Sequence, residues 1–342
     1  MLHVSRYREF MVGLVCDLFL KLTSIYAITY TMNRYRYAAF TVHALFFTAL
    51  AMMAPALGAA LFDEEDTRQP MSTSLLSSEQ RYMGTIVCSG LVQGTGLLLD
   101  LSGLVEGAPP VLLTAAHVLA SRPEADCFYA PMGDQRRTRS IDVNASHRSG
   151  TPLSAVSSPE QRLSGMPEKE FNEQFLGDWV LVSLGKWRRW QQYALELDQY
   201  LFSIWSQDEA EKASLSQDIS VQLAGYSVPA NNLMVDTECH LFSPKAHHLI
   251  IDGGALRSED CEATHGASGG IVFIEHDGRW RPIGLHLGSA FLAGEAADTP
   301  AASSAFDLQT NTNVARLIDR EIVAAMLGLI KADSDSVDTP IW

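Results

Sequence analysis

Three polar residues of this chain lie in segments that could carry out covalent catalysis. His117 follows one short apolar segment, Asp178 directly precedes another, and Ser268 lies among glycines. A serine hydroxyl is a poor nucleophile at neutral pH and needs an imidazole base, while a carboxylate can hold that imidazole in the required tautomer. The three residues therefore predict an acyl-transfer site, with Ser268 as nucleophile, His117 as general base and Asp178 as the orienting carboxylate.

The sequence around the serine, GASGG at residues 266–270, suits a second requirement of acyl transfer. The carbonyl oxygen of the substrate becomes negatively charged in the transition state and needs backbone N–H donors aimed at it. Glycine permits the sharp turns that bring such donors together, because it has no Cβ. We therefore expect the N–H groups of Gly266 and Ser268 to form an oxyanion hole.

Three motifs in a fixed order carry a resemblance to a known family. TAAH at residues 114–117, Asp178 before a buried strand and GxSGG around Ser268 resemble the trypsin/chymotrypsin-like serine peptidases. The order histidine, aspartate, serine separates the chain from α/β-hydrolases and subtilisins. The resemblance spans about residues 81–325 and implies a serine endopeptidase with an all-β fold: two antiparallel six-stranded β-barrels with the triad in the cleft between them.

Two positions depart from the animal digestive members of that family. The residue before the serine is Ala267, where those enzymes have an aspartate that receives a freshly cut N-terminus, so activation by that ion pair cannot operate here. The residue after the histidine is Val118 instead of cysteine. The chain is more similar to bacterial extracellular peptidases of the glutamyl-endopeptidase type, which also carry an acidic arm before the barrels.

Residues 284–288, GLHLG, resemble the strand that lines the primary specificity pocket in the glutamyl-endopeptidase type. The resemblance implies that His286 donates a hydrogen bond to an acidic substrate side chain. His265 and Gly288 are then the neighbouring candidates for substrate binding. Two alternatives stay open, because His286 can be a structural histidine on a strand, and Glu262 would favour basic substrates if it reached the pocket.

A second class of function also stays open, since a folded relative without activity would be a binding module with a peptide groove. We expect no cofactor and no metal for either function. A zinc site built from Cys239, His240, Cys261 and His265 is an alternative, but these residues lack the CxxC and HExxH spacings of common zinc sites.

The cysteines indicate an oxidising compartment. Cys16 lies near the N-terminus, and the other four cysteines follow the apolar N-terminal region. An even number of cysteines in an exported protein suggests two disulfides. Four cysteines allow three pairings, and we expect Cys88–Cys127 and Cys239–Cys261, because each pair brackets one of the catalytic motifs.

An uncharged apolar run at residues 38–60 follows Arg34 and Arg36 and ends in small residues. This layout is typical of a secretory signal peptide. We expect cleavage near residues 58–60 and a secreted or periplasmic protein without a permanent membrane anchor. A membrane anchor is the alternative, since the run is nearly long enough to cross a bilayer. Met32 opens a basic segment of its own and is the expected start of translation.

Charge and composition narrow the partners. The net charge of −15 argues against nucleic acid as a partner, because phosphate binding requires clustered Lys and Arg. Hydrophobic residues make up 47% of the chain and charged residues 19%, which is typical of a globular protein. We therefore expect a monomer that acts on protein or peptide substrates.

Short β-rich segments recur from about residue 81 onward with turns between them, the spacing of an antiparallel sandwich or barrel. The expected strands lie at residues 83–90, 94–101, 111–119, 126–132, 179–185, 219–226, 247–254, 269–275 and 281–288. Residues 144–175 are expected to form a long surface loop, and residues 186–213 a helical or elaborated connection. Apolar residues at helical spacing after Asn313 predict a C-terminal helix, capped by Thr312 or Asn313.

These segments predict an organisation in six parts. They are a dubious N-terminal extension plus signal peptide (1–60), an acidic arm (61–80), a first β-barrel lobe with His117 and Asp178 (81–185), a connecting segment (186–218), a second β-barrel lobe with Ser268 (219–312), and a C-terminal helix and tail (313–342).

Overall fold

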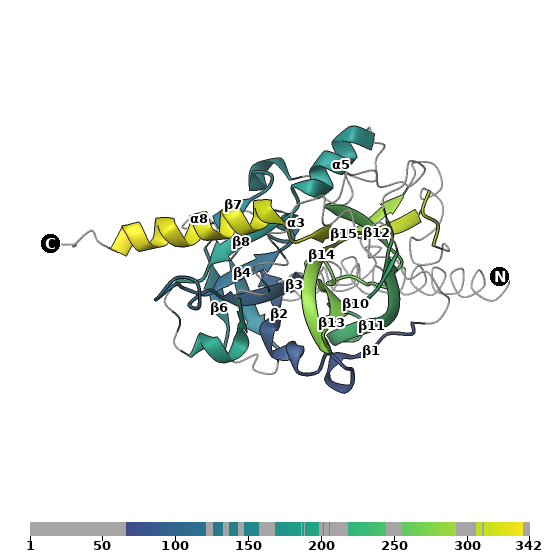
Figure 1. The fold of residues 1–342 in the computed structure, drawn as a ribbon, viewed down its shortest axis with the longest axis horizontal. Helices are drawn as coiled ribbons and strands as arrows, with labels where there is room; N and C mark the ends of the chain where they lie inside the picture. The colour runs from purple at the N-terminus through teal and green to yellow at the C-terminus, as the bar shows by residue number, and fades with distance from the viewer. Residues whose placement is uncertain are drawn as a thin grey trace, which may run out of the picture. The chain divides into compact units, whose positions relative to one another are not determined.

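Two β-sheets make up the body of the chain, as the computed structural model shows (Figure 1). The described residues belong to the unit Ala56–Trp342. They are 66–120, 126–132, 137–142, 147–156, 168–185, 187, 189–197, 201, 205, 218–243, 255–291, 306–309 and 311–337. The predicted signal peptide, Met32, Cys16 and the strand expected at 247–254 lie outside the described residues.

The first sheet is open and curled. Its strands follow the order β6-β5-β2-β3-β4-β8-β7 with antiparallel neighbours, and the short β9 pairs parallel to β3. Strand β3 is buried along its second half, as expected for a strand covered on both faces. The strands are β2 (Met83–Cys88), β3 (Leu91–Asp100), β4 (Val111–Thr114), β5 (Cys127–Pro131), β6 (Arg139–Ile141), β7 (His147–Ser149), β8 (Val180–Ser183) and β9 (Leu195–Glu196).

The second sheet closes on itself. Its order is β1-β11-β10-β13-β14-β15-β12, and a further pairing of β12 with β11 makes a six-stranded barrel with β1 at its edge. Alternate residues fill the interior, for example Val221 with Leu223 and Ala315 with Leu317, because side chains in a strand alternate between faces. The strands are β1 (Gln69–Pro70), β10 (Ile219–Ser227), β11 (Asn232–Leu241), β12 (Leu256–Glu259), β13 (Ile271–His276), β14 (Arg279–Phe291) and β15 (Asn311–Leu317).

This architecture is the chymotrypsin-like fold that the sequence resemblance implied. The second lobe is a closed six-stranded barrel, while the sheet of the first lobe stays open and curled. His117 and Asp178 belong to the first lobe, and Ser268 lies in the segment between β12 and β13 of the second. The predicted catalytic residues therefore come from different lobes.

Helices cover and connect the sheets. The α-helices with described bounds are α3 (Ala116–Ala120), α5 (Glu168–Leu176) and α8 (Arg320–Val337), and the 3₁₀ turns are η1 (Met71–Thr73), η2 (Glu79–Tyr82), η3 (Leu153–Ala155) and η4 (Trp190–Tyr193). Helix α8 packs against β7 and β8 of the first sheet (Figure 1). Helix α5 falls where the sequence predicted only a surface loop. In the part of the chain that the structure describes, no helix is long and apolar enough to span a membrane.

The C-terminal helix begins later than the sequence pattern predicted. Residues Asn311–Leu317 form β15, which pairs with β12 and β14. Helix α8 starts at Arg320, and the Asp319 carboxylate accepts two backbone N–H groups of its first turn. Neither Thr312 nor Asn313 is the cap, because both are buried in the barrel. A short segment with a few apolar residues can form either a strand or a helix. Here it forms a strand, because it pairs with both β12 and β14.

Both expected disulfides are present. Cys88 pairs with Cys127 across β2 and β5, and Cys239 pairs with Cys261 inside the second barrel. A grouping of Cys239, Cys261 and Asp260 has the proximity of metal ligands, but its two sulfur atoms are bonded to each other. The alternative zinc site would require the same two sulfur atoms as free thiolates.

Candidate active site

His117 and Asp178 make a doubly bonded pair. His117 lies at the second position of α3, which follows β4 directly. Its backbone N–H donates to Asp178 Oδ1 at 2.9 Å, and its Nδ1 lies 2.7 Å from Asp178 Oδ2. The Asp178 side chain is fully buried. An ionised Asp178 accepts the Nδ1 proton, and Nε2 of a neutral imidazole is then left as a proton acceptor.

Asp178 is positioned by groups from both lobes. It lies two residues after the end of α5, and its own N–H donates to the Phe175 carbonyl at 3.2 Å. The neighbouring Leu176 carbonyl accepts a 2.9 Å hydrogen bond from Nε of Arg316, a fully buried residue of β15. A side chain at Gly177 would collide with Thr151. The end of α5 is thus fixed on several sides.

The serine loop, residues 264–270, turns on two glycines with positive φ. Gly266 has φ +97° and Gly269 has φ +77°, values that residues with a Cβ rarely adopt. The N–H of Ala267 donates to the Thr264 carbonyl at 2.9 Å, and the N–H of Gly269 donates to the His286 carbonyl at 2.8 Å. Among the described residues, the N–H groups of Gly266 and Ser268 have no such acceptor.

The orientation of those two N–H groups follows from the carbonyls of the same peptide units. The His265 carbonyl accepts from Val228 N–H at 2.9 Å, and the Ala267 carbonyl accepts from Gly270 N–H at 2.6 Å. In a trans peptide the N–H points away from the C=O, and no described peptide bond is cis. The N–H groups of Gly266 and Ser268 therefore point to the opposite side from Val228 and Gly270, which bond to these carbonyls.

The serine loop lies against the elements that carry His117. A Cβ on Gly94 of β3 would lie 2.6 Å from the Ser268 carbonyl and 2.6 Å from Cγ2 of Val118, the neighbour of His117. A Cβ on Gly269 would lie 3.1 Å from the backbone nitrogen of Ala115. The structure thus brings together the segments of all three predicted triad residues.

His286 lies inside the second barrel and pairs with a carboxylate. Its Nδ1 is 2.5 Å from Oε1 of Glu259, and both side chains are fully buried. Its backbone pairs with the serine loop, since its N–H donates to the Gly270 carbonyl at 2.8 Å. Burial raises the pKa of the Glu259 carboxyl, although His286 acts in the opposite direction. Nε2 of His286 has no hydrogen-bond partner among the described residues.

The other candidates for substrate binding lie nearby. His265 is exposed at the start of the serine loop. Gly288 has φ +122° and follows a register shift between β14 and β15 that begins at His286. Leu287 is the extra residue at this shift, since His286 still pairs with Ala315 and Gly288 pairs with Val314, and such bulges are common beside functional sites.

Glu262, the alternative pocket residue, is engaged by the arm at residues 66–70. Its Oε2 accepts 3.1 Å hydrogen bonds from both the N–H and the hydroxyl of Thr67. The adjacent Arg68 donates from Nη1 to the Thr264 hydroxyl at 3.1 Å. Burial raises the pKa of the Glu262 carboxyl. The acidic arm therefore holds the segment that leads into the serine loop.

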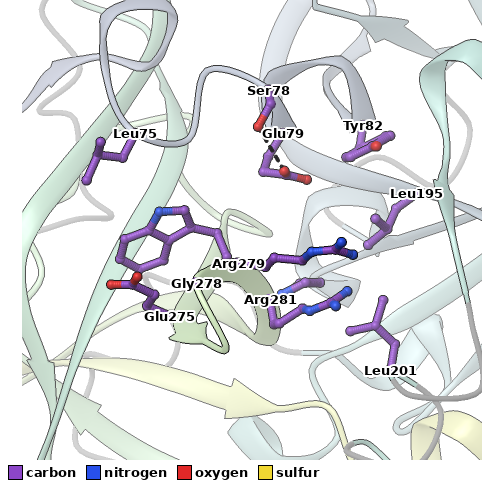
Figure 2. A pocket seen from close by; sticks show the side chains of 12 residues that line it. Leu75, Ser78, Glu79, Tyr82, Leu195, Leu201, Glu275, Gly278, Arg279 and Arg281 are labelled. Atoms are coloured by element: carbon purple, nitrogen blue, oxygen red, sulfur yellow. Dashed lines mark hydrogen bonds between the residues drawn. The ribbon is translucent and has the colours of Figure 1, made fainter.

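A pocket of about 490 Å³ is lined by none of the three predicted catalytic residues (Figure 2). It is bounded by η2 and the turn between β13 and β14. In Figure 2, the Arg279 and Arg281 side chains extend in the same direction from alternate positions of β14. Acidic side chains, Glu79 and Glu275, also line it. Because its walls carry both signs of charge and no triad residue, we assign it no part in the chemistry.

Sequence reasoning missed two residues of the site. Glu259 is the partner of His286, and Thr95 hydrogen bonds to the serine loop. Both are polar residues in or beside β-rich segments, where a surface position is the ordinary expectation. Contacts between segments far apart in the chain, which no local pattern encodes, place them inside.

Comparisons with known proteins find similar structures and no sequence relatives. No family model and no curated protein matches the chain. The protease Anisep from Arthrobacter nicotinovorans is 11% identical over 73% of this chain and 96% of that one, with a TM-score of 0.43. Kallikrein-related peptidase 10 is 14% identical over 74% of this chain and 97% of that one, with a TM-score of 0.42.

Replacing Gly269 by Ala should destabilise the protein strongly. The new Cβ would lie 2.3 Å from both the Thr95 carbonyl and the Thr114 hydroxyl, and φ is positive. Gly90→Ala is the matched control, because Gly90 has φ +80° with no atom within 4 Å. We expect a cost of about 1–3 kcal/mol from strain in the control and a larger loss for Gly269→Ala, measured by urea unfolding. Equal losses would contradict the close packing of the serine loop.

Replacing Glu262 by Gln should change the pH dependence of stability. The free energy of unfolding of the variant should rise relative to that of the parent as pH rises. The folded-state pKa of Glu262 lies above its ordinary value of 4.5 because of burial. Its contribution to stability is therefore complete below the unfolded-state pKa and is lost as pH rises through the folded-state pKa. Gln has no proton to lose, so its contribution to stability does not change with pH. Urea unfolding between about pH 4 and 8 measures this difference, with the exposed Glu106→Gln as control, and a difference independent of pH would contradict the burial argument.

Proposed function

We propose that this protein is a serine endopeptidase with His117, Asp178 and Ser268 as its triad. The observation that carries the proposal is the buried Asp178 carboxylate, bonded twice to His117. Beside it lies a serine loop that leaves two backbone N–H groups uncommitted among the described residues. A base oriented by a carboxylate and donors for an oxyanion are the two requirements of acyl transfer.

The reaction proceeds in two halves. Ser268 Oγ attacks the substrate carbonyl carbon while His117 Nε2 takes its proton, and the carbonyl oxygen becomes an oxyanion held by the N–H groups of Gly266 and Ser268. His117 then gives the proton to the leaving amine as the C–N bond breaks, which leaves an acyl-enzyme. Water repeats the sequence on the ester and releases the acid. Asp178 stays ionised and stabilises the imidazolium that forms.

We propose a preference for acidic residues before the scissile bond, read by His286. The His286–Glu259 pair is fully buried, and a buried net charge is costly, so a pair of zero net charge is favoured. At zero net charge, the imidazole and the carboxyl together carry two dissociable protons. One of them is shared between Nδ1 and Glu259, and the other lies on Nε2, whichever group holds the shared proton. The pair therefore presents an N–H donor, which a substrate carboxylate accepts more strongly than an amide.

The proposed setting is secreted or periplasmic, reached through the signal peptide at residues 32–60. The disulfides Cys88–Cys127 and Cys239–Cys261 fit an oxidising compartment. Protein or peptide chains are the proposed substrates of a monomeric enzyme. A binding module without activity is the other candidate, favoured only if the peptidase assays below are negative.

Ser268→Ala or His117→Ala should lower kcat for a general protein substrate on the order of 10⁴–10⁶-fold while leaving the fold intact. Asp178→Asn should also be severely impaired, because the wrong imidazole tautomer would face the serine. Labelling by a fluorophosphonate probe should be lost in Ser268→Ala. Circular dichroism controls for folding. A Ser268→Ala variant that cleaves as fast as the parent would rule out the proposed enzyme.

Peptides with Glu before the scissile bond should be cut faster than matched peptides with Gln. A hydrogen bond to a charged group contributes about 1.5–3 kcal/mol, so we expect a roughly 10- to 150-fold ratio of kcat/KM. The double variant His286→Leu/Glu259→Leu should erase most of that ratio without leaving a buried carboxylate unpaired. Cleavage of uncharged peptides by this variant is the control. A peptide-library profile dominated by Lys, Arg or aromatic residues would refute the role of His286.

A further inference from the structure

Thr95 of β3 is a fully buried residue that bonds to both lobes. Its hydroxyl accepts a hydrogen bond from Tyr226 N–H of β10 at 2.8 Å and donates to the Gly266 carbonyl at 2.8 Å. Its backbone N–H donates to the Ser268 carbonyl at 2.8 Å. Its own carbonyl accepts from the Thr114 hydroxyl at 2.7 Å. One residue of the first lobe thus contacts the serine loop on both sides of Ala267.

The backbone of Thr95 is free for these contacts because its neighbouring strand has ended. Strand β4 pairs with β3 through Leu97 opposite Leu113, and this register would place residue 115 opposite Thr95. Strand β4 instead ends at Thr114 and turns into α3, which carries His117. The serine loop of the other lobe therefore hydrogen bonds to β3 at Thr95, where β4 would otherwise pair. The segment that carries His117 begins at the same point along β3.

The two carbonyls that Thr95 holds belong to the peptide units on either side of the one that carries the Ser268 N–H. The Gly266 carbonyl lies in the peptide unit before it, and the Ser268 carbonyl lies in the one after it. Because peptide units are planar, fixing these neighbours restricts the rotation of the unit between them. Thr95 thus restricts the direction of an N–H that the proposed mechanism aims at the oxyanion.

The hydroxyl has to donate and accept at once. A hydroxyl can do both, whereas valine has the same shape and can do neither. Removing the hydroxyl would leave the Gly266 carbonyl and the Tyr226 N–H unpaired in a buried place, and the loop would move to satisfy them. Gly266 precedes Ala267 and Ser268 directly, so this movement would reach the oxyanion donors.

We propose that Thr95 is a positioning residue that sets the oxyanion-binding geometry of the serine loop, acting through its hydroxyl from the opposite lobe. This inference rests on the proposed peptidase function. Thr95 does not itself touch the substrate. A residue that only ties the lobes together would affect stability alone, so the two roles differ in a measurable way.

The experiment compares Thr95→Val with Thr95→Ser and with Thr85→Val. Thr85 is a buried threonine directly opposite Thr95 on β2 and matches the loss of a buried hydroxyl. Loss of an oxyanion donor lowers kcat by about 10²–10³-fold, and a misdirected donor should cost less, about 10- to 100-fold. We expect that loss in kcat for Thr95→Val with KM nearly unchanged. Thr95→Ser should restore activity, and Thr85→Val should turn over like the parent.

A peptide boronate gives the second readout, because it forms a tetrahedral adduct on the serine that uses the oxyanion hole. Its affinity should fall in Thr95→Val by about the same factor as kcat, since both report transition-state stabilisation. If Thr95→Val does not fold, Thr95→Cys replaces the hydroxyl by a thiol, a weaker donor and acceptor, and should show a smaller loss of both quantities, with Thr95→Ser as the control for the missing methyl group.

Three results would overturn the inference. The first is parental kcat and boronate affinity in a folded Thr95→Val or Thr95→Cys, whatever its melting temperature, which would assign Thr95 a structural role only. The second is an equal loss of kcat in Thr85→Val. The third is a parent protein that neither cleaves peptides nor reacts with the fluorophosphonate probe, which would overturn the proposed peptidase function together with the role of Thr95.

Discussion

The burial of the Asp178 carboxylate is the constraint on which the rest of the site depends. A buried charge without hydrogen bonds is very costly, and the N–H and the imidazole of His117 both bond to it. Helix α3 must therefore start where it does, directly after β4, and β4 must end early. That early end exposes the edge of β3 to the serine loop. Arg316 fixes the segment before Asp178 from the second lobe, so one carboxylate determines how elements of both lobes approach each other.

Local pattern was sufficient to predict the fold class. The resemblance carried by three motifs implied a two-lobed β fold, and the recurring β-rich segments agreed with it. Strands with continuous apolar residues, such as β4 and β8, were predicted because burial on both faces makes them hydrophobic throughout. Strand β11 was not predicted, since Asp236 and Glu238 interrupt its apolar positions, and its burial alternates because the barrel interior covers only one of its two faces.

The candidate site residues were named from sequence, but their surroundings were not. Acyl transfer requires a histidine, an aspartate and a serine, and the types and order of these residues can be read from the sequence alone. The hydroxyl of Thr95 and the carboxylate of Glu259 act through pairing between distant strands, which leaves no periodic signal. The same limit explains the late start of α8, because β15 becomes a strand through its partners β12 and β14 and not through its own composition.

The outer segments of the described chain cross over between the lobes. The arm before the first lobe adds β1 to the barrel of the second, while α8, which follows the last strand of the second lobe, lies on the sheet of the first. Each lobe is thus partly covered by a segment attached to the other. Separating the lobes must also detach a strand or uncover a sheet, so the two lobes should unfold in a single cooperative transition, and neither would be a complete unit if expressed alone.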